Sequence, residues 1–132
     1  MISLAQYFID RPRTTEQGLE AITLLDRVNR LLTEYMTDTG VESPINPATG
    51  SQISGETEGG FRLPDCPQGA PNSSHKQAMA CDIYDPHNAL DDWLTDDLLA
   101  QFDLYREAPE ATIHWCHLTT RAPHSGKRTF IP

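Results

Sequence analysis

Apolar residues recur every three or four positions in the first third of the chain, with charged and polar residues between them. This spacing places the apolar side chains on one face of a helix. It therefore predicts an amphipathic helix from about Thr15 to Thr37. Gly40 lies just beyond it, where a glycine can adopt the left-handed conformation that ends many helices. The residues of the expected apolar face are Ile22, Leu25, Val28, Leu32 and Tyr35.

Two capping-box patterns mark the expected starts of helices in the same region. Ser3 is followed by Gln6, and Thr14 is followed by Gln17. In this pattern the first side chain accepts a hydrogen bond from a free backbone N–H, and the glutamine reaches back to the cap. We therefore expect a short helix after Ser3 and the long amphipathic helix after Thr14.

The middle of the chain, residues 41–72, is rich in proline, glycine and small polar residues. Such residues favour turns, so we expect turns with short strands near 52–54 and 60–63. A helical turn over 75–79 and a strand over 80–84 should follow.

The last third of the chain predicts one helix and one strand. Asn88 is a favourable N-cap, and apolar residues continue from it at helical spacing to about Arg106. The stretch from Thr112 to Thr120 contains the β-branched and aromatic residues that favour a strand. The expected apolar stripe of the helix consists of Leu90, Leu94, Leu98, Phe102 and Tyr105.

Length and element order together indicate the fold class. The 132 residues suffice for one domain with a single core. Helices come first, over 1–40, and helices and strands share the region 41–132, which makes α+β the natural class. We therefore expect a single α+β domain over residues 1–132.

Charge and composition exclude several kinds of partner. Nineteen acidic residues against ten basic ones give a net charge of −9, which repels nucleic acid. No apolar run approaches the roughly 18 residues of a membrane-spanning helix, so no membrane span is expected. The first residues lack the pattern of a signal peptide, which predicts synthesis in the cytoplasm. Three cysteines without a CxxC spacing indicate reduced thiols.

His75 and Asp82 are candidate metal ligands. They lie in a stretch of mostly small, apolar and uncharged polar residues, although both residue types are usually exposed unless something pairs with them. On one continuous helix they would be about 10 Å apart along the axis, whereas two ligands of one zinc ion each lie about 2 Å from it. A helical turn followed by a strand allows them to converge.

A third ligand is needed for a catalytic zinc site, which usually has three protein ligands and one open position. We choose His117, because it lies in the middle of the last strand and shares a face with Trp115 and Thr119. His114 and Cys116 fall on the opposite face. A histidine in an apolar strand is more often a hydrogen-bonded core residue than a ligand, and the spacing alone leaves that alternative open. The histidines expected to face solvent are His87 and His124.

These residues also resemble a known family. Ser73, His75, Ala80 and Asp82 fit S-x-H-x-x-G-x-A-x-D, which resembles the first metal motif of the zinc D-Ala-D-Ala carboxypeptidases and their phage endolysin relatives. HWCHL resembles the later motif that supplies the last zinc histidine, His117. ISGETEGGFRLP resembles a segment of the family that ends in an arginine, and the chain's opening and ending resemble a small phage and prophage branch.

The resemblance implies a fold and a set of roles. Enzymes of this family cut peptide bonds in bacterial peptidoglycan, and their helices pack on an antiparallel sheet that carries the zinc. By that resemblance Zn²⁺ is bound by His75, Asp82 and His117. The residues expected at the substrate are Arg62, which would stabilise the oxyanion or hold a substrate carboxylate, Ser73, which would support the site through a hydrogen bond, and Trp115, which would line the cleft.

The sequence departs from the family pattern at two positions. Ala78 replaces the glycine of the first motif, which matters only if the backbone there has a positive φ. His114 stands where many relatives have the carboxylate that removes a proton from the attacking water. Four alternatives follow: His114 itself accepts the proton, Glu107 or Glu110 takes over, the base is lost and the zinc is structural or binds ligand without turnover, or another residue is the base.

The leading hypothesis is thus a zinc peptidase that acts on peptidoglycan stem or cross-link peptides. It would be encoded by a phage or prophage, and would travel in the virion or be released to the cell wall. The first alternative is a non-catalytic binding or virion-structural module with the same fold. The second is a domain without any metal.

Overall fold

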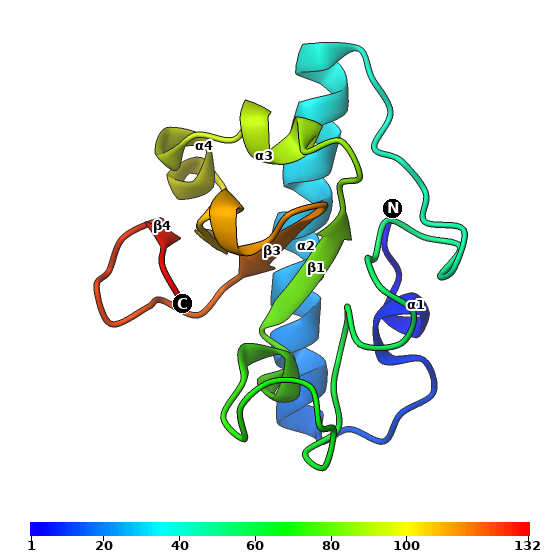
Figure 1. The fold of residues 1–132 in the computed structure, drawn as a ribbon. Helices are drawn as coiled ribbons and strands as arrows, with labels where there is room; N and C mark the ends of the chain where they lie inside the picture. Colours follow the sequence, from blue (N-terminus) through cyan, green and yellow to red (C-terminus); the bar gives the residue numbers. More distant parts are fainter.

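A four-stranded sheet packs against one long helix in the computed structural model, which describes residues 1–132 (Figure 1). The helices are α1 (Leu4–Phe8), α2 (Thr15–Thr39), α3 (Ala89–Trp93) and α4 (Asp96–Gln101), with 3₁₀-helices at Ser74–Gln77 and Pro109–Ala111. The strands are β1 (Ala80–Tyr84), β2 (Tyr105–Glu107), β3 (Trp115–Thr119) and β4 (Thr129–Phe130). The α+β class predicted from the sequence is confirmed.

The strands are arranged in the order β1-β3-β2-β4. β3 pairs antiparallel with both β1 and β2, whereas β4 pairs parallel with β2. The sheet is therefore mixed, and the expectation of a wholly antiparallel sheet is wrong at β4. The reason is that the chain leaves β3 and passes through a loop before it returns to the far side of β2 (Figure 1).

Helix α2 confirms the amphipathic prediction. Thr14 and Gln17 form the expected capping box, and Gly40 ends the helix with a φ of 71°. Ile22 is an exception, because 52% of its surface is exposed. The buried face is centred on neighbouring positions and includes Ala21, Leu24, Leu25, Val28, Leu31, Leu32 and Tyr35.

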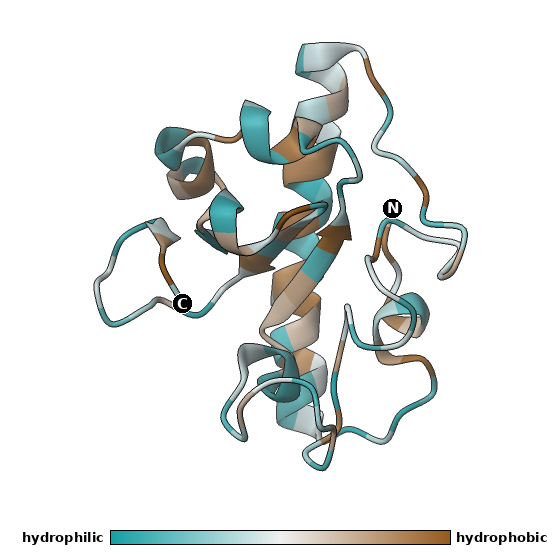
Figure 2. Cartoon of the chain, viewed as in Figure 1, coloured by the Kyte–Doolittle hydropathy of each residue, from teal (hydrophilic) through white to brown (hydrophobic).

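The core lies between α2 and one face of the sheet. Cys81 and Ile83 of β1 and Cys116 and Leu118 of β3 belong to the same buried cluster as the apolar face of α2. In Figure 2 apolar segments of α2 and of the sheet meet near the centre of the molecule. Because side chains alternate along a strand, the opposite face of the sheet is left free to carry polar groups.

The single helix predicted over 88–106 is wrong. Leu94 has an extended backbone, and Thr95 caps a second helix by accepting a hydrogen bond from the Leu98 N–H. The chain then turns at Asp103, with a φ of 52°, and continues as strand β2. The helical spacing of the apolar residues is real, but tertiary pairing of β2 with β3 and β4 outweighs it.

Arg106 stabilises the break between α3 and α4. Its guanidinium donates to the backbone carbonyls of Asp91 and Leu94, at 2.8 and 3.3 Å, and to the Asp91 carboxylate at 3.2 Å. These carbonyls would otherwise lack partners where helix α3 ends.

Asn88 lies at the N-cap position of α3, as expected, but it does not act as a cap. Asn88 is left-handed and its side chain makes no capping hydrogen bond. The Asp85 carboxylate instead accepts the backbone N–H groups of Leu90 and Asp91 at 3.0 Å each, which is the role of a cap.

The remaining elements lie close to their expected positions. The helical turn expected over 75–79 is the 3₁₀-helix Ser74–Gln77, and β1 coincides with the predicted strand. The strand expected over 112–120 begins only at Trp115. Segment 52–54 contributes one isolated bridge, from Ile53 to Ile83, and no strand forms over 60–63.

The three cysteines are free, and Cys81 and Cys116 are buried. Burial raises the pKa of both thiols well above the usual value, so they behave as small core residues. None of the helices has the length and apolar character needed to cross a membrane.

Candidate metal centre

One row of residues across the four strands forms the floor of the candidate site. Asp82 of β1 lies directly opposite His117 of β3. The next step of the β2–β3 register places Glu107 beside His117, and Glu107 is paired with Phe130 of β4. The row therefore runs Asp82, His117, Glu107, Phe130, and all four residues line the same cavity.

His75 approaches this row from the 3₁₀-helix before β1. Ser73 caps that helix, and its hydroxyl accepts the His75 N–H at 3.3 Å. The chain then passes through Ala78, which has a φ of 58° and a ψ of 33°, and enters β1. The departure from the family pattern at Ala78 thus falls at a positive φ, a conformation that costs a residue with a Cβ about 1–2 kcal/mol.

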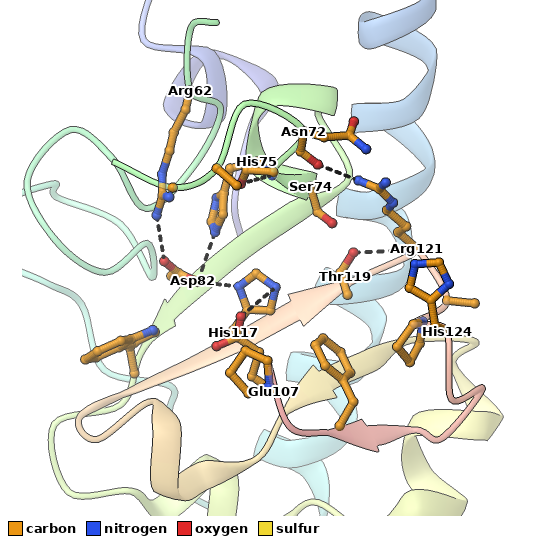
Figure 3. Close-up of a pocket in the computed structure, with 18 residues that line it drawn as sticks. Arg62, Asn72, Ser74, His75, Asp82, Glu107, His117, Thr119, Arg121 and His124 are labelled. Atoms are coloured by element: carbon orange, nitrogen blue, oxygen red, sulfur yellow. Dashed lines mark hydrogen bonds and ion pairs between the residues drawn. The ribbon is translucent and has the colours of Figure 1, made fainter. Parts of the chain in front are cut away.

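The ligand atoms of His75, Asp82 and His117 lie within 4.8 Å of one another, and all three residues are buried. His75 Nε2 is 3.3 Å and His117 Nδ1 is 2.9 Å from the same carboxylate oxygen, Asp82 Oδ1. Two ligands held tetrahedrally at about 2.0–2.1 Å from one zinc ion are about 3.3 Å apart. The His75–Asp82 distance matches this spacing and the His117–Asp82 distance is shorter, so the cluster could hold a metal ion. Figure 3 shows the three side chains pointing toward one another.

The second ring nitrogen of His75 fixes its orientation. Nδ1 is 2.8 Å from the carbonyl oxygen of Gly60, and a carbonyl can only accept, so Nδ1 carries the hydrogen. In the neutral ring Nε2 then presents a lone pair to the Asp82 carboxylate. Two lone pairs at that distance repel, so a cation, either a proton or a metal ion, is needed between them. Histidine ligands of metals are commonly held by such a bond from the other ring nitrogen.

Only glycine fits at position 60, the residue whose carbonyl oxygen contacts His75 Nδ1, because the backbone of Tyr7 lies too close for a side chain. A Cβ at this position would lie 2.6 Å from the backbone oxygen of Tyr7. The close approach ties the turn that holds His75 to helix α1. The Tyr7 hydroxyl in turn donates to the carbonyl of Ala80, at 2.8 Å, and so anchors α1 to the start of β1.

The charges of the cluster favour ionised Asp82. Burial by itself would raise the pKa of Asp82, but the neighbouring His75 and His117 hold it well below its usual value. Burial alone would lower the pKa of His117, but the hydrogen bond and charge of Asp82, together with the charge of Glu107, raise it. The same negative charge that raises the pKa of His117 would favour a bound metal cation, and metal binding would compete with protonation of that ring.

The cluster opens into a cavity of about 600 Å³. Three side chains expected at the substrate, Arg62, Ser73 and Trp115, line it. Arg62 Nη2 lies 3.5 Å from Asp82 Oδ2, and Arg62 Nε donates to the carbonyl of Glu58 at 2.7 Å. The structure therefore brings together the three expected ligands and the three expected substrate residues.

The three residues considered as the base are placed differently. Glu107 lines the cavity, and its Oε1 is 3.9 Å from His117 Nε2. His114 is exposed outside the cavity, with a φ of 77° and its Nδ1 at 3.0 Å from the carbonyl of Pro86. Glu110 is exposed on the second 3₁₀-helix and does not line the cavity either. His114 and Glu110 are therefore directed away from the cluster.

Several cavity residues were not expected from the sequence. Arg121 and His124, in the segment after β3, line the cavity, as does Asn72. His124 is exposed, as expected, but it is exposed to the cavity. The basic character of the C-terminal segment was the only available signal, because the return of this segment to the sheet is a long-range feature.

Comparisons of the chain with protein-family models, with curated proteins and with solved structures found no match.

Proposed function

We propose that this protein is a zinc-dependent peptidase that cleaves peptidoglycan stem or cross-link peptides, and that a phage or prophage encodes it. The observation that carries the proposal is the inward-facing Nε2 of His75, held by Gly60 against Asp82 and His117 at the floor of an open cavity. The resemblance of the two metal motifs supplies the substrate class.

A zinc ion held by these residues would lower the pKa of a bound water and polarise the scissile carbonyl. We assign removal of the proton to the carboxylate of Glu107, whose Oε1 lies 3.9 Å from His117 Nε2, the ring nitrogen on the other side from the Nδ1 that faces Asp82. It is the one of the three candidate bases that lines the cavity. A positioned general base contributes typically 10²–10⁴-fold to a rate.

Arg62 suits the stabilisation of negative charge at the carbonyl oxygen. It is half-buried beside Asp82 and is fixed by its bond to the carbonyl of Glu58. Donors held in place before the reaction stabilise a developing oxyanion without rearrangement. Arg62 was considered for two roles, stabilising the oxyanion or holding a substrate carboxylate. We assign it to the oxyanion.

The proposal is tested by incubating purified peptidoglycan with the zinc-loaded protein and identifying released peptides by mass spectrometry. We expect peptide release by the wild type and none by the chelated protein. The His117→Ala variant should lose both zinc and peptide release. Release by a His117→Ala variant that contains no zinc would contradict the proposal. Stoichiometric association with phage particles without any turnover would support the non-catalytic alternative instead.

A further inference from the structure

Arg121 is a cation at the cavity without an acidic partner. Its guanidinium donates to the backbone carbonyl of Asn72 at 2.8 Å, and it forms no ion pair with a carboxylate of the chain. A guanidinium has five N–H donors, so most of them are left for another group. The bond to Asn72 nevertheless holds the side chain in place beside the cavity (Figure 3).

Arg62, the other arginine of the cavity, is already engaged. It pairs with Asp82 and with the carbonyl of Glu58. In Figure 3 Arg62 lies on the Asp82 side of the ligand cluster, whereas Arg121 and His124 lie on the other side. Arg62 is therefore held at the ligand cluster by its partners, whereas Arg121 keeps free N–H donors on the other side of the cluster.

Because the protein as a whole is negatively charged, the unpaired Arg121 at the cavity is a candidate binding site for an anion. A net charge of −9 repels anions at long range, yet Arg121 and His124 line the cavity with no carboxylate paired to Arg121. Asn72 and Ser74 add further polar groups to this part of the lining. An arginine fork is suited to a planar carboxylate, which it can bind through two parallel hydrogen bonds.

We propose that Arg121, with His124 beside the same part of the cavity, binds the free C-terminal carboxylate of the substrate peptide. This inference rests on the proposed function, since it assumes that the cavity holds a peptide. The two arginines then have separate roles. Arg62 acts at the reacting carbonyl, and Arg121 selects peptides whose chain ends close to the scissile bond.

The test compares two ligands that differ only at the carboxylate. A stem peptide ending in D-alanyl-D-alanine is prepared as the free acid and as the C-terminal amide. Binding of each is measured by calorimetry to the full chain after removal of metal, so that no turnover interferes. A charged hydrogen-bonded pair is worth about 1.5–3 kcal/mol, so we expect the wild type to bind the acid roughly 10- to 100-fold more tightly than the amide.

Two variants give the matched comparison. Arg121→Gln should reduce the preference for the acid by at least about tenfold while it binds the amide as the wild type does. Lys127→Gln makes the same change of charge on an exposed residue of the same segment that does not line the cavity, and it should keep the preference. Thermal unfolding of each variant verifies that the fold is retained.

The outcomes separate this inference from the proposed function. Equal binding of acid and amide by the wild type, no binding of either, or an unchanged preference in Arg121→Gln would overturn the carboxylate site, even if peptidoglycan is digested. A preference that disappears in Arg121→Gln would support the carboxylate site, even if the zinc-loaded protein digests nothing and the peptidase proposal fails.

Discussion

The Glu107→Gln variant is expected to bind zinc like the wild type and to hydrolyse the substrate peptide about 10²–10⁴-fold more slowly. Glu107 extends the row of Asp82 and His117 across the sheet and ends 3.9 Å from His117 Nε2. Glutamine has nearly the same shape but cannot accept the proton. The measurement is kcat for peptide release by protein whose zinc content has been verified.

Two further variants serve as controls for the Glu107 result. His114→Gln and Glu110→Gln should keep the wild-type rate within a few-fold, because neither side chain lines the cavity. A His114→Gln variant that is inactive but still holds zinc, beside a fully active Glu107→Gln, would show that the base is His114 and that the free protein must rearrange to use it.

Replacing Arg106 with alanine is expected to lower the free energy of unfolding by about 3–5 kcal/mol. Its side chain is buried and pairs with Asp91 at 3.2 Å, while it also satisfies two backbone carbonyls at the break between α3 and α4. Removal of the guanidinium would leave those acceptors, and a buried carboxylate, without their donor. Urea-induced unfolding followed by circular dichroism measures the loss.

The matched control for Arg106 is Arg30→Ala. Arg30 pairs with Asp26 at 3.8 Å on α2, and both side chains are mostly exposed. Exposed pairs of this kind contribute about 0.5 kcal/mol or less, so its unfolding midpoint should remain close to the wild type. If Arg106→Ala lost no more stability than Arg30→Ala, the assigned role of Arg106 at the helix break would be wrong.

The grouping of His75, Asp82 and His117 was predictable because two of the three residues are close in the sequence. His75 and Asp82 belong to one short segment whose turn and strand are readable from residue types. His117 followed from the two-residue period of its strand, which places it with Trp115 and Thr119 and away from the core. The pairing of Asp82 with His117 across β1 and β3 then brought these residues together.

The place of Glu107 was harder to predict from the sequence. Leu98, Phe102 and Tyr105 continue a helical spacing, which predicts a helix up to the residue before Glu107. Only the long-range bonds of Arg106 and the pairing of β2 with its neighbours show that the chain is extended there. The choice between His114 and Glu107 therefore depended on strand register, which the sequence pattern does not determine.

The C-terminal wall of the cavity was not predictable for a similar reason. Arg121 and His124 lie in a segment with turn-like residues, and such segments usually face solvent. β4 contributes two residues to the sheet, too few to leave a strand pattern in the sequence. This short pairing nevertheless places Phe130 in the row of the site and in the lining of the cavity that Arg121 also lines.

The most direct test of the metal centre is the zinc content of the purified protein and of its His75→Ala variant, by elemental analysis after dialysis against zinc. We predict about one zinc per wild-type chain and none in the variant, with the far-ultraviolet circular dichroism of both showing a retained fold. A folded wild-type protein that takes up no zinc, or a His75→Ala variant that keeps it, would contradict the assignment of His75, Asp82 and His117 as a metal site.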